Sequence, residues 1–414
     1  MVIACAGCGW PAPPRSATPF RCPRAGTDDV DHVLVRRLDP SAAWPDERDP
    51  NPFLRYRRFL ASYDRAEDDA HFVDVVTRLD KAVAAVDGRG FTVTPFRWAD
   101  ALGAWVKDET GNVAGSHKGR HLMGLAIWLE MAGVEKSRQL AIASCGNAAL
   151  AAGVIARASG RPLSVFVPTW ADDSVVARLG DLGAELHVCP REPADPPGDP
   201  CVHRFREAVA AGAVPFSCQG PDNGLTIDGG RTLAYELADA EVSLDALVVQ
   251  AGGGALASAV AQGLHEAVVL GRLHREPAVH VVQPEANAPL VRAWQRARET
   301  AEETPRTRRA HRRDFMWPWQ PAGTSVATGI LDDEAYDWAS VVDALLRTGG
   351  TAIAVGEDDL VRANELARSA TGIDVDPTGS AGLAGLVALR ETHAASPGAG
   401  AVSPDARAAV LFTG

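Results

Sequence analysis

A lysine at the start of an expected helix is the first residue whose position suggests chemistry. Lys118 lies in the segment KDETGNVAGSHKGRHLMGLAIWLE, which begins at Lys107, and Gly115-Ser116 supplies a turn and a helix cap just before it. The amino end of a helix is the positive pole of its dipole, which disfavours an ammonium and favours a neutral amine. A neutral amine can form a Schiff base with an aldehyde. Lys118 is therefore a candidate nucleophile, and a solvated surface lysine is the plain alternative.

The segment SCGN is a candidate carboxylate site. It follows an expected strand and opens an expected helix, with Ser144 and Asn147 as side-chain donors. Free backbone amides at the start of a helix can hold an anion. An ordinary helix cap is the alternative for this segment.

A run of three glycines is a candidate phosphate site. Gly252, Gly253 and Gly254 stand between an expected strand and an expected helix, where glycine lets backbone N–H groups approach a phosphate closely. Gly252, Gly254 and Ala257 also match the G-x-G-x-x-A dinucleotide fingerprint. The acidic residue of that fingerprint is missing at the end of the next strand, where Glu285 lies just beyond it.

The elements that must position these residues alternate between strand and helix. Strands are expected at 140–143, 163–167 and 185–188, with helices at 148–158 and 174–182; the pattern returns as 245–249, 255–264 and 278–282, and a strand-like run precedes Thr413. The helix after Lys118 is expected to bury one face, formed by Leu122, Leu125, Ala126 and Leu129. The pattern predicts an α/β fold with doubly wound parallel sheets, whose ligands lie at the carboxyl ends of the strands.

Composition limits the classes of partner. The 414 residues make one large or two ordinary domains, and 41 basic against 53 acidic residues give a net charge of −12. We therefore expect no nucleic acid and no membrane partner, because both need a cationic surface or a long apolar span. Seven scattered cysteines and no signal-peptide pattern predict a reducing, cytoplasmic location. The basic run Thr304 to Phe315 is interpreted as a solvated insertion, and 191–200 and 395–405 as loops.

Taken together and in this order, the motifs resemble the fold type II, or tryptophan-synthase-β-like, pyridoxal 5′-phosphate enzymes, and most closely the threonine-synthase-like members. The blocks that carry the resemblance are NPFLRYRRFL (51–60), TPF (94–96), VKDETGN with GSHKGR, SCGN, GGRTLAYE (229–236), the triglycine loop, QPEANAPL from Gln283, SVATGI from Ser325, DPTGSAGLAGL from Asp376 and the terminal FTG. They span nearly the whole chain.

The resemblance implies a role for each motif residue. Lys118 would hold the cofactor through a Schiff base and then move protons at the substrate, and Thr413 would face the pyridine nitrogen. The cofactor phosphate would be bound by Gly252, Gly253, Gly254, Ala255 and Leu256, and the substrate carboxylate by Ser144, Cys145, Gly146 and Asn147. Asn147 would also bind the cofactor's 3′ oxygen.

The resemblance also implies an architecture and a metal. It divides the chain into a zinc-ribbon-like head (residues 1–34), a large cofactor-binding domain (35–120 and 215–414) and a small domain (121–214), and it implies a homodimer. In the head, Cys5, Cys8 and Cys22 lack the fourth cysteine of such a ribbon, and His32 is the nearest substitute. Three cysteines and one histidine form an accepted set for Zn²⁺. A degenerate ribbon that folds without metal is the alternative.

The activity implied is elimination or replacement at the β or γ carbon of a small amino acid, as in the conversion of O-phosphohomoserine to threonine and phosphate. Lys107, Arg120 and Arg55 are the candidate partners of the substrate phosphate. A serine/threonine dehydratase or a β-replacement synthase of the same fold is the main alternative. An NAD-dependent dehydrogenase built on the triglycine loop, in which Lys118 is dispensable, and a non-catalytic paralogue are more remote alternatives.

Overall fold

Two sheets of mostly parallel strands organise the chain in the computed structural model, which describes residues 2–196, 198–300, 302–321, 323–395 and 400–414. The larger sheet contains β3 (Phe96–Ala99), β4 (Ala104–Asp108), β9 (Ala246–Gln250), β10 (Ala278–Pro284), β11 (Ala352–Val355) and β12 (Ala408–Phe412). The smaller sheet contains β5 (Leu140–Ala143), β6 (Leu163–Val167), β7 (Glu185–Val188) and β8 (Val214–Pro215). A separate antiparallel pair is formed by β1 (Val2–Cys5) and β2 (Leu34–Arg37).

Helices cover both faces of these sheets. The longer ones are α2 (Asp69–Asp87), α3 (Lys118–Met131), α4 (Asn147–Ser159), α5 (Asp173–Asp181), α6 (Pro200–Ala210), α7 (Thr226–Asp239), α8 (Ala255–Val269), α9 (Pro289–Glu299), α12 (Trp338–Thr348), α13 (Glu357–Thr371) and α14 (Pro377–Ala395). The shorter ones are α1 (Pro52–Arg55), α10 (Pro305–Ala310) and α11 (Arg312–Phe315), with 3₁₀ turns at Arg57–Phe59, Tyr63–Arg65, Asp100–Leu102, Val113–Gly115 and Thr328–Ile330.

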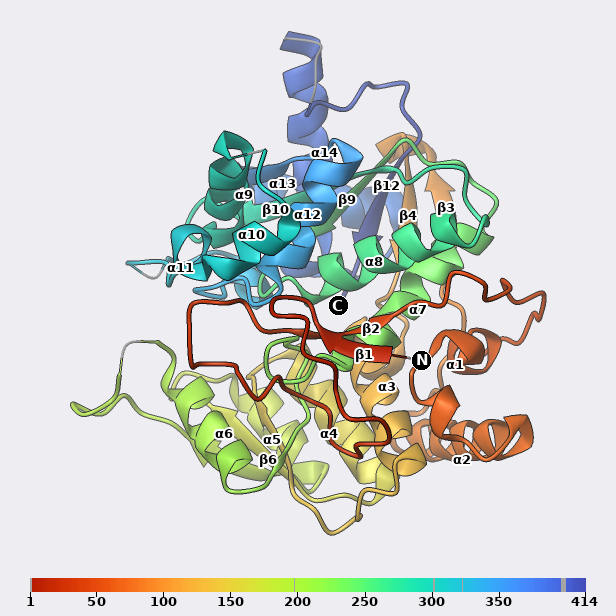
Figure 1. The fold of residues 1–414 in the computed structure, drawn as a ribbon. Coiled ribbons are helices and arrows are strands. Elements are labelled where there is room, and N and C mark those ends of the chain that lie inside the picture. Colours follow the sequence, from red (N-terminus) through yellow and green to blue (C-terminus); the bar gives the residue numbers. More distant parts are fainter. Residues whose placement is uncertain (1, 197, 301, 322, 396–399) are drawn as a thin grey trace.

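The strand order places sequentially distant strands side by side. The larger sheet runs β11-β10-β9-β12-β4-β3 and the smaller β7-β6-β5-β8, and every neighbouring pair is parallel except β3 with β4. In Figure 1 the larger sheet and its helices fill the upper part of the view and α4, α5 and α6 the lower part. Strands β6, β9 and β12 are buried along their whole length, as expected for parallel strands covered on both faces. The predicted α/β class with parallel sheets is confirmed.

Helix α3 is buried far more completely than its sequence predicted. Every residue of α3 except Lys118 and Glu130 is buried, so the expectation of a single buried face was wrong. The reason is a close crossing with α7, where glycines replace side chains. A Cβ on Gly124 would lie 2.7 Å from the Gly229 Cα, and one on Gly229 would collide with the Arg120 carbonyl oxygen. The GGRTLAYE segment therefore fixes the position of α3, and with it that of Lys118.

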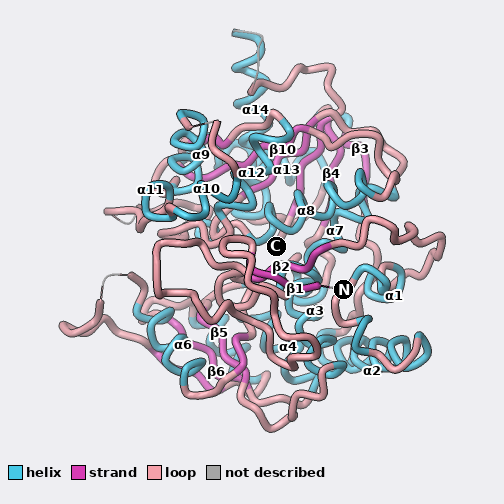
Figure 2. Tube along the Cα trace, in the orientation of Figure 1, coloured by secondary structure: helices cyan, strands magenta, loops and turns pink. Residues whose placement is uncertain are grey.

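The N-terminal segment and the basic run are packed against each other. Figure 2 shows this segment as mostly loop, with the β1–β2 ribbon crossing the middle of the view. The run from Thr304 to Phe315 is not a solvated insertion as predicted, because it forms α10 and α11 and buries Arg308 and Arg309. Arg309 binds Asp31 through its side chain (3.1 Å) and accepts a hydrogen bond from the Asp31 amide (2.7 Å). Paired charges allow these arginines to be buried.

Two expectations about boundaries, the loop at 395–405 and the division into domains, are not tested by the structure. Residues 396–399 of the expected loop at 395–405 lie outside the described residues, and the division into a head and two domains stays a prediction. Within the described ranges, the structure contains no helix both long and apolar enough to span a bilayer.

Candidate active site

One cavity collects the candidate residues from both sheets. Its volume is about 1430 Å³, and it is bordered by the loops that follow β5, β9 and β12. The predicted site residues that line it are Lys118, Ser144, Cys145, Gly146, Asn147, Gly252, Gly253, Gly254, Ala255, Leu256 and Thr413. These loops lie at the carboxyl ends of parallel strands, where ligands of such sheets bind. The cavity is larger than the roughly 300–1,000 Å³ of an ordinary ligand site.

The triglycine loop offers backbone amides to the cavity. A Cβ on Gly253 would lie 2.9 Å from the Tyr336 ring, and Gly254 has φ +90°, a conformation that side chains disfavour. The first backbone hydrogen bond of α8 runs from the Ser258 amide to the Gly254 carbonyl (2.9 Å). The amides just before Ser258 have no acceptor among the described backbone groups and lie at the positive end of the α8 dipole, and the Gly253 amide faces the Asp332 carboxylate. This is a cradle suited to an anion such as phosphate.

Lys118 differs from the other lysines of the chain. The sequence contains four lysines, and among the described residues Lys118 alone of the four lines the cavity. Lys118 is the first residue of α3, and its backbone amide donates a hydrogen bond to the Ser116 hydroxyl (3.4 Å). In the described part of the chain, no carboxylate forms an ion pair with the Lys118 amine. Lys107, in contrast, is buried and forms an ion pair with Glu236. The Lys118 amine is therefore available to a ligand.

The SCGN loop and the last strand meet at the cavity. The Asn147 side-chain amide donates a hydrogen bond to the Gly414 carbonyl oxygen, which ties the loop after β12 to the start of α4. The Thr413 hydroxyl oxygen accepts a hydrogen bond from the Gln250 side-chain amide (2.8 Å). Because Gln250 supplies the donor, the Thr413 hydroxyl keeps its own proton for an acceptor in the cavity.

The three cations expected to bind a substrate phosphate do not line the cavity. Arg120 is fully buried and binds Glu109 (2.7 Å) and Glu236 (2.6 Å). Lys107 binds the same Glu236, and Arg55 pairs with Asp239 (2.5 Å). The prediction was wrong because sequence alone does not show which carboxylates fold against these cations. They hold α3, α7 and the β4 loop together instead.

Several cavity residues were missed by sequence reasoning. His117 is 6% exposed, and neither of its ring nitrogens has a hydrogen-bond partner among the described residues. Burial and the neighbouring Lys118 charge lower the pKa of His117 well below its usual value, so its imidazole is neutral. Position next to Lys118 was the only available signal for this residue.

An acidic stretch after the SVATGI block also reaches the cavity. Asp332 and Asp333 both line it, and a Cβ on Gly252 would collide with the Asp332 carboxylate. Burial raises the pKa of Asp332 to about 6 against the opposing effects of the Lys118 ammonium and the Gly253 amide. The pKa of Asp333 is also raised, by burial and by the neighbouring Glu334. No known spacing marked these two residues in the sequence.

The four candidate metal ligands of the head lie together. The ligand atoms of Cys5, Cys8, Cys22 and His32 are all within 4.8 Å of one another. The Cys5 sulfur is 3.4 Å from His32 Nδ1, and the Cys8 and Cys22 sulfurs are 3.8 Å apart. The other ring nitrogen, His32 Nε2, lies 3.0 Å from an Asp28 carboxylate oxygen, an outer partner that commonly orients a metal-binding histidine. The donor set and its compactness fit a tetrahedral Zn²⁺.

Comparison with known proteins places these features in a family. Among curated proteins, threonine synthase from Methanocaldococcus jannaschii is 25% identical over 324 residues, covering 75% of this chain and 69% of that protein. Cysteate synthase from Methanoculleus marisnigri is 27% identical over 280 residues, covering 66% of this chain and 60% of that protein. The structure of threonine deaminase isoform 2 from Solanum lycopersicum matches with a TM-score of 0.60 at 14% identity, covering 92% and 95% of the two chains.

The structural match agrees with the α/β fold of the fold type II enzymes. The curated relatives are named for different reactions, so they indicate the general kind of enzyme and not one particular reaction. The sequence profile described as pyridoxal-phosphate dependent enzyme matches residues 89–414, more than half of the chain. The chain therefore belongs to the pyridoxal-phosphate dependent enzyme family, with pyridoxal 5′-phosphate as its cofactor and an amino acid as the kind of molecule on which it acts.

Proposed function

We propose that this enzyme catalyses elimination or replacement at the β or γ carbon of a small α-amino acid, in the manner of the threonine-synthase-like group. One observation carries the proposal: Lys118, the SCGN loop, the triglycine cradle and Thr413 line a single cavity. Each of these residues comes from a different part of the fold, and together they provide an amine, a carboxylate site, a phosphate site and a hydroxyl.

The residues present fit the cofactor. The amides from Gly252 to Leu256 form a cradle for its phosphate, and the loop has no Cβ where Asp332 and Tyr336 press against it. Lys118 is the amine that can hold its aldehyde carbon. Thr413, with its proton free to donate, would face the pyridine nitrogen, and a neutral hydroxyl at that position would leave the nitrogen largely unprotonated. When bound, the cofactor supplies an electron sink for carbanionic chemistry at the substrate.

The protein's own contribution is to bind and orient the substrate and to move a proton. The loop from Ser144 to Asn147, at the amino end of α4, would hold the substrate carboxylate through backbone amides and the Ser144 hydroxyl. With the carboxylate fixed there, the Lys118 amine would take the proton from the α carbon and return one later in the reaction. Burial of α3 on nearly all sides keeps that amine in place.

A serine/threonine dehydratase or a β-replacement synthase is the second candidate, and one observation favours it. The cations proposed for a substrate phosphate are engaged elsewhere, and a neutral hydroxyl leaving group needs none of them. A structural Zn²⁺ on Cys5, Cys8, Cys22 and His32 is part of the same proposal, as are a homodimer and a cytoplasmic location.

The test is the visible absorption of the purified protein, before and after borohydride. We expect a Schiff-base band that borohydride removes and that Lys118→Ala lacks. Lys81→Ala, which removes an exposed lysine on α2, is the matched control and should keep the band. With only four lysines in the chain, the reduced adduct can be mapped by peptide mass to one of them. An adduct on another lysine, or no band after adding the cofactor, would overturn the proposal.

A further inference from the structure

We infer that Asp332 is part of the cofactor phosphate site and that its carboxyl group is neutral while the phosphate is bound, so that binding of the cofactor takes up a proton. The inference rests on the proposed function in one respect, because it takes the triglycine loop as the phosphate cradle. It depends on three features of Asp332: its contact with that loop, its lack of a counter-charge and the packing of the segment that carries it.

The Asp332 side chain lies against the loop itself. A Cβ on Gly252 would collide with the Asp332 carboxylate, and a Cβ on Gly253 would lie 3.6 Å from one of its oxygens. The Gly253 amide, which is one of the donors of the cradle, faces the same carboxylate. A phosphate bound by this loop would therefore lie next to Asp332, and two anions would compete for one donor.

Asp332 has no counter-charge to offset its own. In the described ranges, no lysine or arginine forms an ion pair with its carboxylate. The titratable groups that face it are those of Lys118, Asp333, Tyr336 and Cys145. Of these four, Lys118 is the one cation, and in the proposed function its amine is engaged by the cofactor aldehyde. Burial outweighs the Lys118 charge and the Gly253 amide and raises the pKa of Asp332 to about 6.

The backbone around Asp332 is held against the loop. The buried Asn287 side-chain amide donates a hydrogen bond to the Asp332 carbonyl oxygen (2.8 Å). Two residues earlier, the Ile330 Cα would lie 2.9 Å from a Cβ on Gly252, so the two backbones are in direct contact. Because this segment packs on the loop through its main chain, we expect Asp332 to stay beside a bound phosphate rather than be displaced by it.

A neutral carboxyl group suits this position better than a carboxylate. A carboxylate only accepts hydrogen bonds and would repel the phosphate, whereas a protonated carboxyl group has an O–H to donate to a phosphate oxygen. The phosphate charge also favours the neutral form, so the pKa of Asp332 should rise above its value of about 6 when the cofactor binds. At neutral pH the group is then mostly ionised before binding and mostly protonated after it, and solvent supplies the proton.

The Kd of the cofactor over a range of pH tests the inference, with absorbance as the readout. Asp332→Asn replaces the carboxyl group with an amide, which is neutral at every pH and can also donate. We expect parent and variant to bind pyridoxal 5′-phosphate within about twofold of each other at pH 5, and the variant to bind about tenfold more tightly at pH 8. Lys118 and the cofactor titrate alike in both proteins, so the ratio of the two Kd values isolates residue 332. Pyridoxal, which lacks the phosphate, should show no such divergence.

Calorimetry measures the proton itself. The binding enthalpy of pyridoxal 5′-phosphate at pH 7, measured in buffers of different ionisation enthalpy, gives the number of protons taken up. The parent should take up about half a proton more than Asp332→Asn, or a larger fraction. Asp332→Ser, a smaller neutral variant, repeats both measurements if the asparagine variant is unstable.

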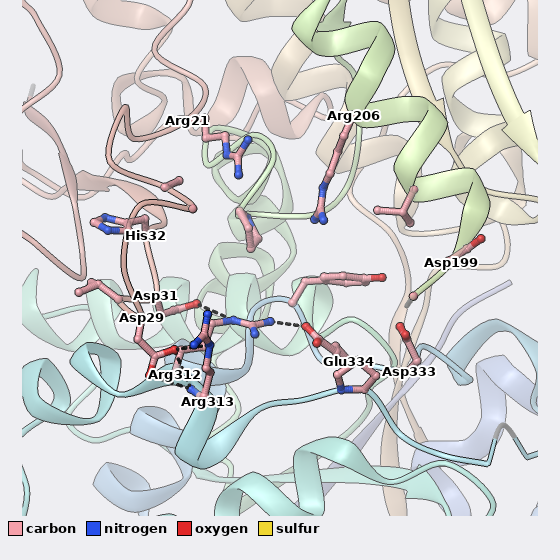
Figure 3. Close-up of a pocket in the computed structure, with 18 of the residues that line it drawn as sticks. Arg21, Asp29, Asp31, His32, Asp199, Arg206, Arg312, Arg313, Asp333 and Glu334 are labelled. Atoms are coloured by element: carbon pink, nitrogen blue, oxygen red, sulfur yellow. Dashed lines mark hydrogen bonds and ion pairs between the residues drawn. The ribbon is translucent and has the colours of Figure 1, made fainter. Parts of the chain in front are cut away.

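Asp333→Asn is the matched control, because it removes an equal charge from the next residue. Asp333 also borders a smaller pocket of about 340 Å³, and Figure 3 shows it there on the same side as Asp199. Asp332 is not among the described residues that border this pocket. The amides that face Asp333 are its own and that of Glu334, and neither belongs to the cradle. Asp333→Asn should therefore keep the proton uptake and the pH dependence of the parent.

Two kinds of failure can be told apart. A ratio of Kd values that stays constant from pH 5 to 8, or that changes equally with pyridoxal, would overturn the inference while leaving the enzyme class intact. A pH dependence that Asp333→Asn removes as fully as Asp332→Asn would overturn it as well. If the parent forms no Schiff-base band with the cofactor at any pH, the proposed function is refuted, and the inference with it.

Discussion

Replacing Arg120 with leucine tests whether that residue holds the fold together or binds substrate. Arg120 is buried between two carboxylates, Glu109 and Glu236, and it also donates to Thr94 and Thr232 (3.1 Å each). With Lys107 as the second cation, the cluster contains two positive and two negative side chains. Arg120→Leu leaves one cation facing two buried carboxylates, and so creates one uncompensated buried charge.

The expected loss of stability is large. Removing one partner of a buried ion pair destabilises a protein by about 3–5 kcal/mol, because the remaining charge stays buried without a counter-charge. An unfolding entropy of about 2.1 cal/mol/K per residue, applied to 414 residues, converts this to a fall in Tm of roughly 3–6 °C. Arg78→Leu breaks an exposed pair with Asp74 and should change stability by less than about 1 kcal/mol.

The loss should depend on pH in a defined direction. Burial alone would raise the pKa of Glu109, but the Arg120 guanidinium outweighs burial and holds that pKa below its usual value. The Arg120–Glu109 pair therefore stabilises the folded protein fully above the pKa of Glu109 in the unfolded chain, near 4.5. This stabilisation is lost as the pH falls through the lower pKa that Glu109 has in the folded protein. Without Arg120, burial dominates and the folded pKa rises above the unfolded value. The difference between Arg120→Leu and the parent should then grow as pH rises from about 5 to 8.

Urea unfolding at pH 5 and pH 8 measures this difference directly. Adding Glu109→Gln to Arg120→Leu removes the uncompensated charge and should recover part of the stability at pH 8. The reasoning is refuted if Arg120→Leu unfolds like the parent at pH 8 but binds phosphorylated amino acids more weakly. That result would return Arg120 to the role of a phosphate ligand.

Three shorter predictions concern the cofactor, the metal and the acidic stretch at Asp332. Gly252→Ala should weaken the binding of pyridoxal 5′-phosphate at least tenfold, because the added Cβ would collide with the Asp332 carboxylate and lie 2.9 Å from the Ile330 Cα. Titration of the cofactor, followed by absorbance, measures this Kd. An unchanged Kd would show that the loop adapts to the added methyl group. Cys22→Ser should lower the zinc content of protein purified without chelators from about one atom per chain to near zero, as measured by elemental analysis; a parent protein without zinc would support the metal-free head. Because burial raises the pKa of Asp332 to about 6, its ionised form opposes folding, so stability falls as pH rises from about 4 through 6. Asp332→Asn should flatten that fall and stabilise the cofactor-free protein at pH 7, on the order of 1 kcal/mol, and urea unfolding across this range would contradict the assignment if the two curves stayed parallel.

The sequence alone determined the local elements and the set of candidate residues. A run of about ten residues is enough to show a preference for strand or helix. The β-branched run Leu163–Val167 forms β6, and the alanine-rich run Asn147–Ser159 forms α4. The motif residues follow strands, so their arrival at the carboxyl ends of parallel sheets could also be predicted. Family resemblance then supplied the cofactor, which the match to residues 89–414 confirmed.

Only the tertiary structure decided how buried charges and helix surfaces find their partners. Arg120 meets Glu236 across 116 positions of sequence, and Arg309 meets Asp31 across 278, so no local pattern could have distinguished a structural cation from a ligand-binding one. The same holds for α3, whose polar surface at Arg120 and His121 is buried because Gly229 and Gly230 of α7 make space for it. Burial depends on what packs against a side chain, and that partner is fixed by the fold rather than by neighbours in the chain.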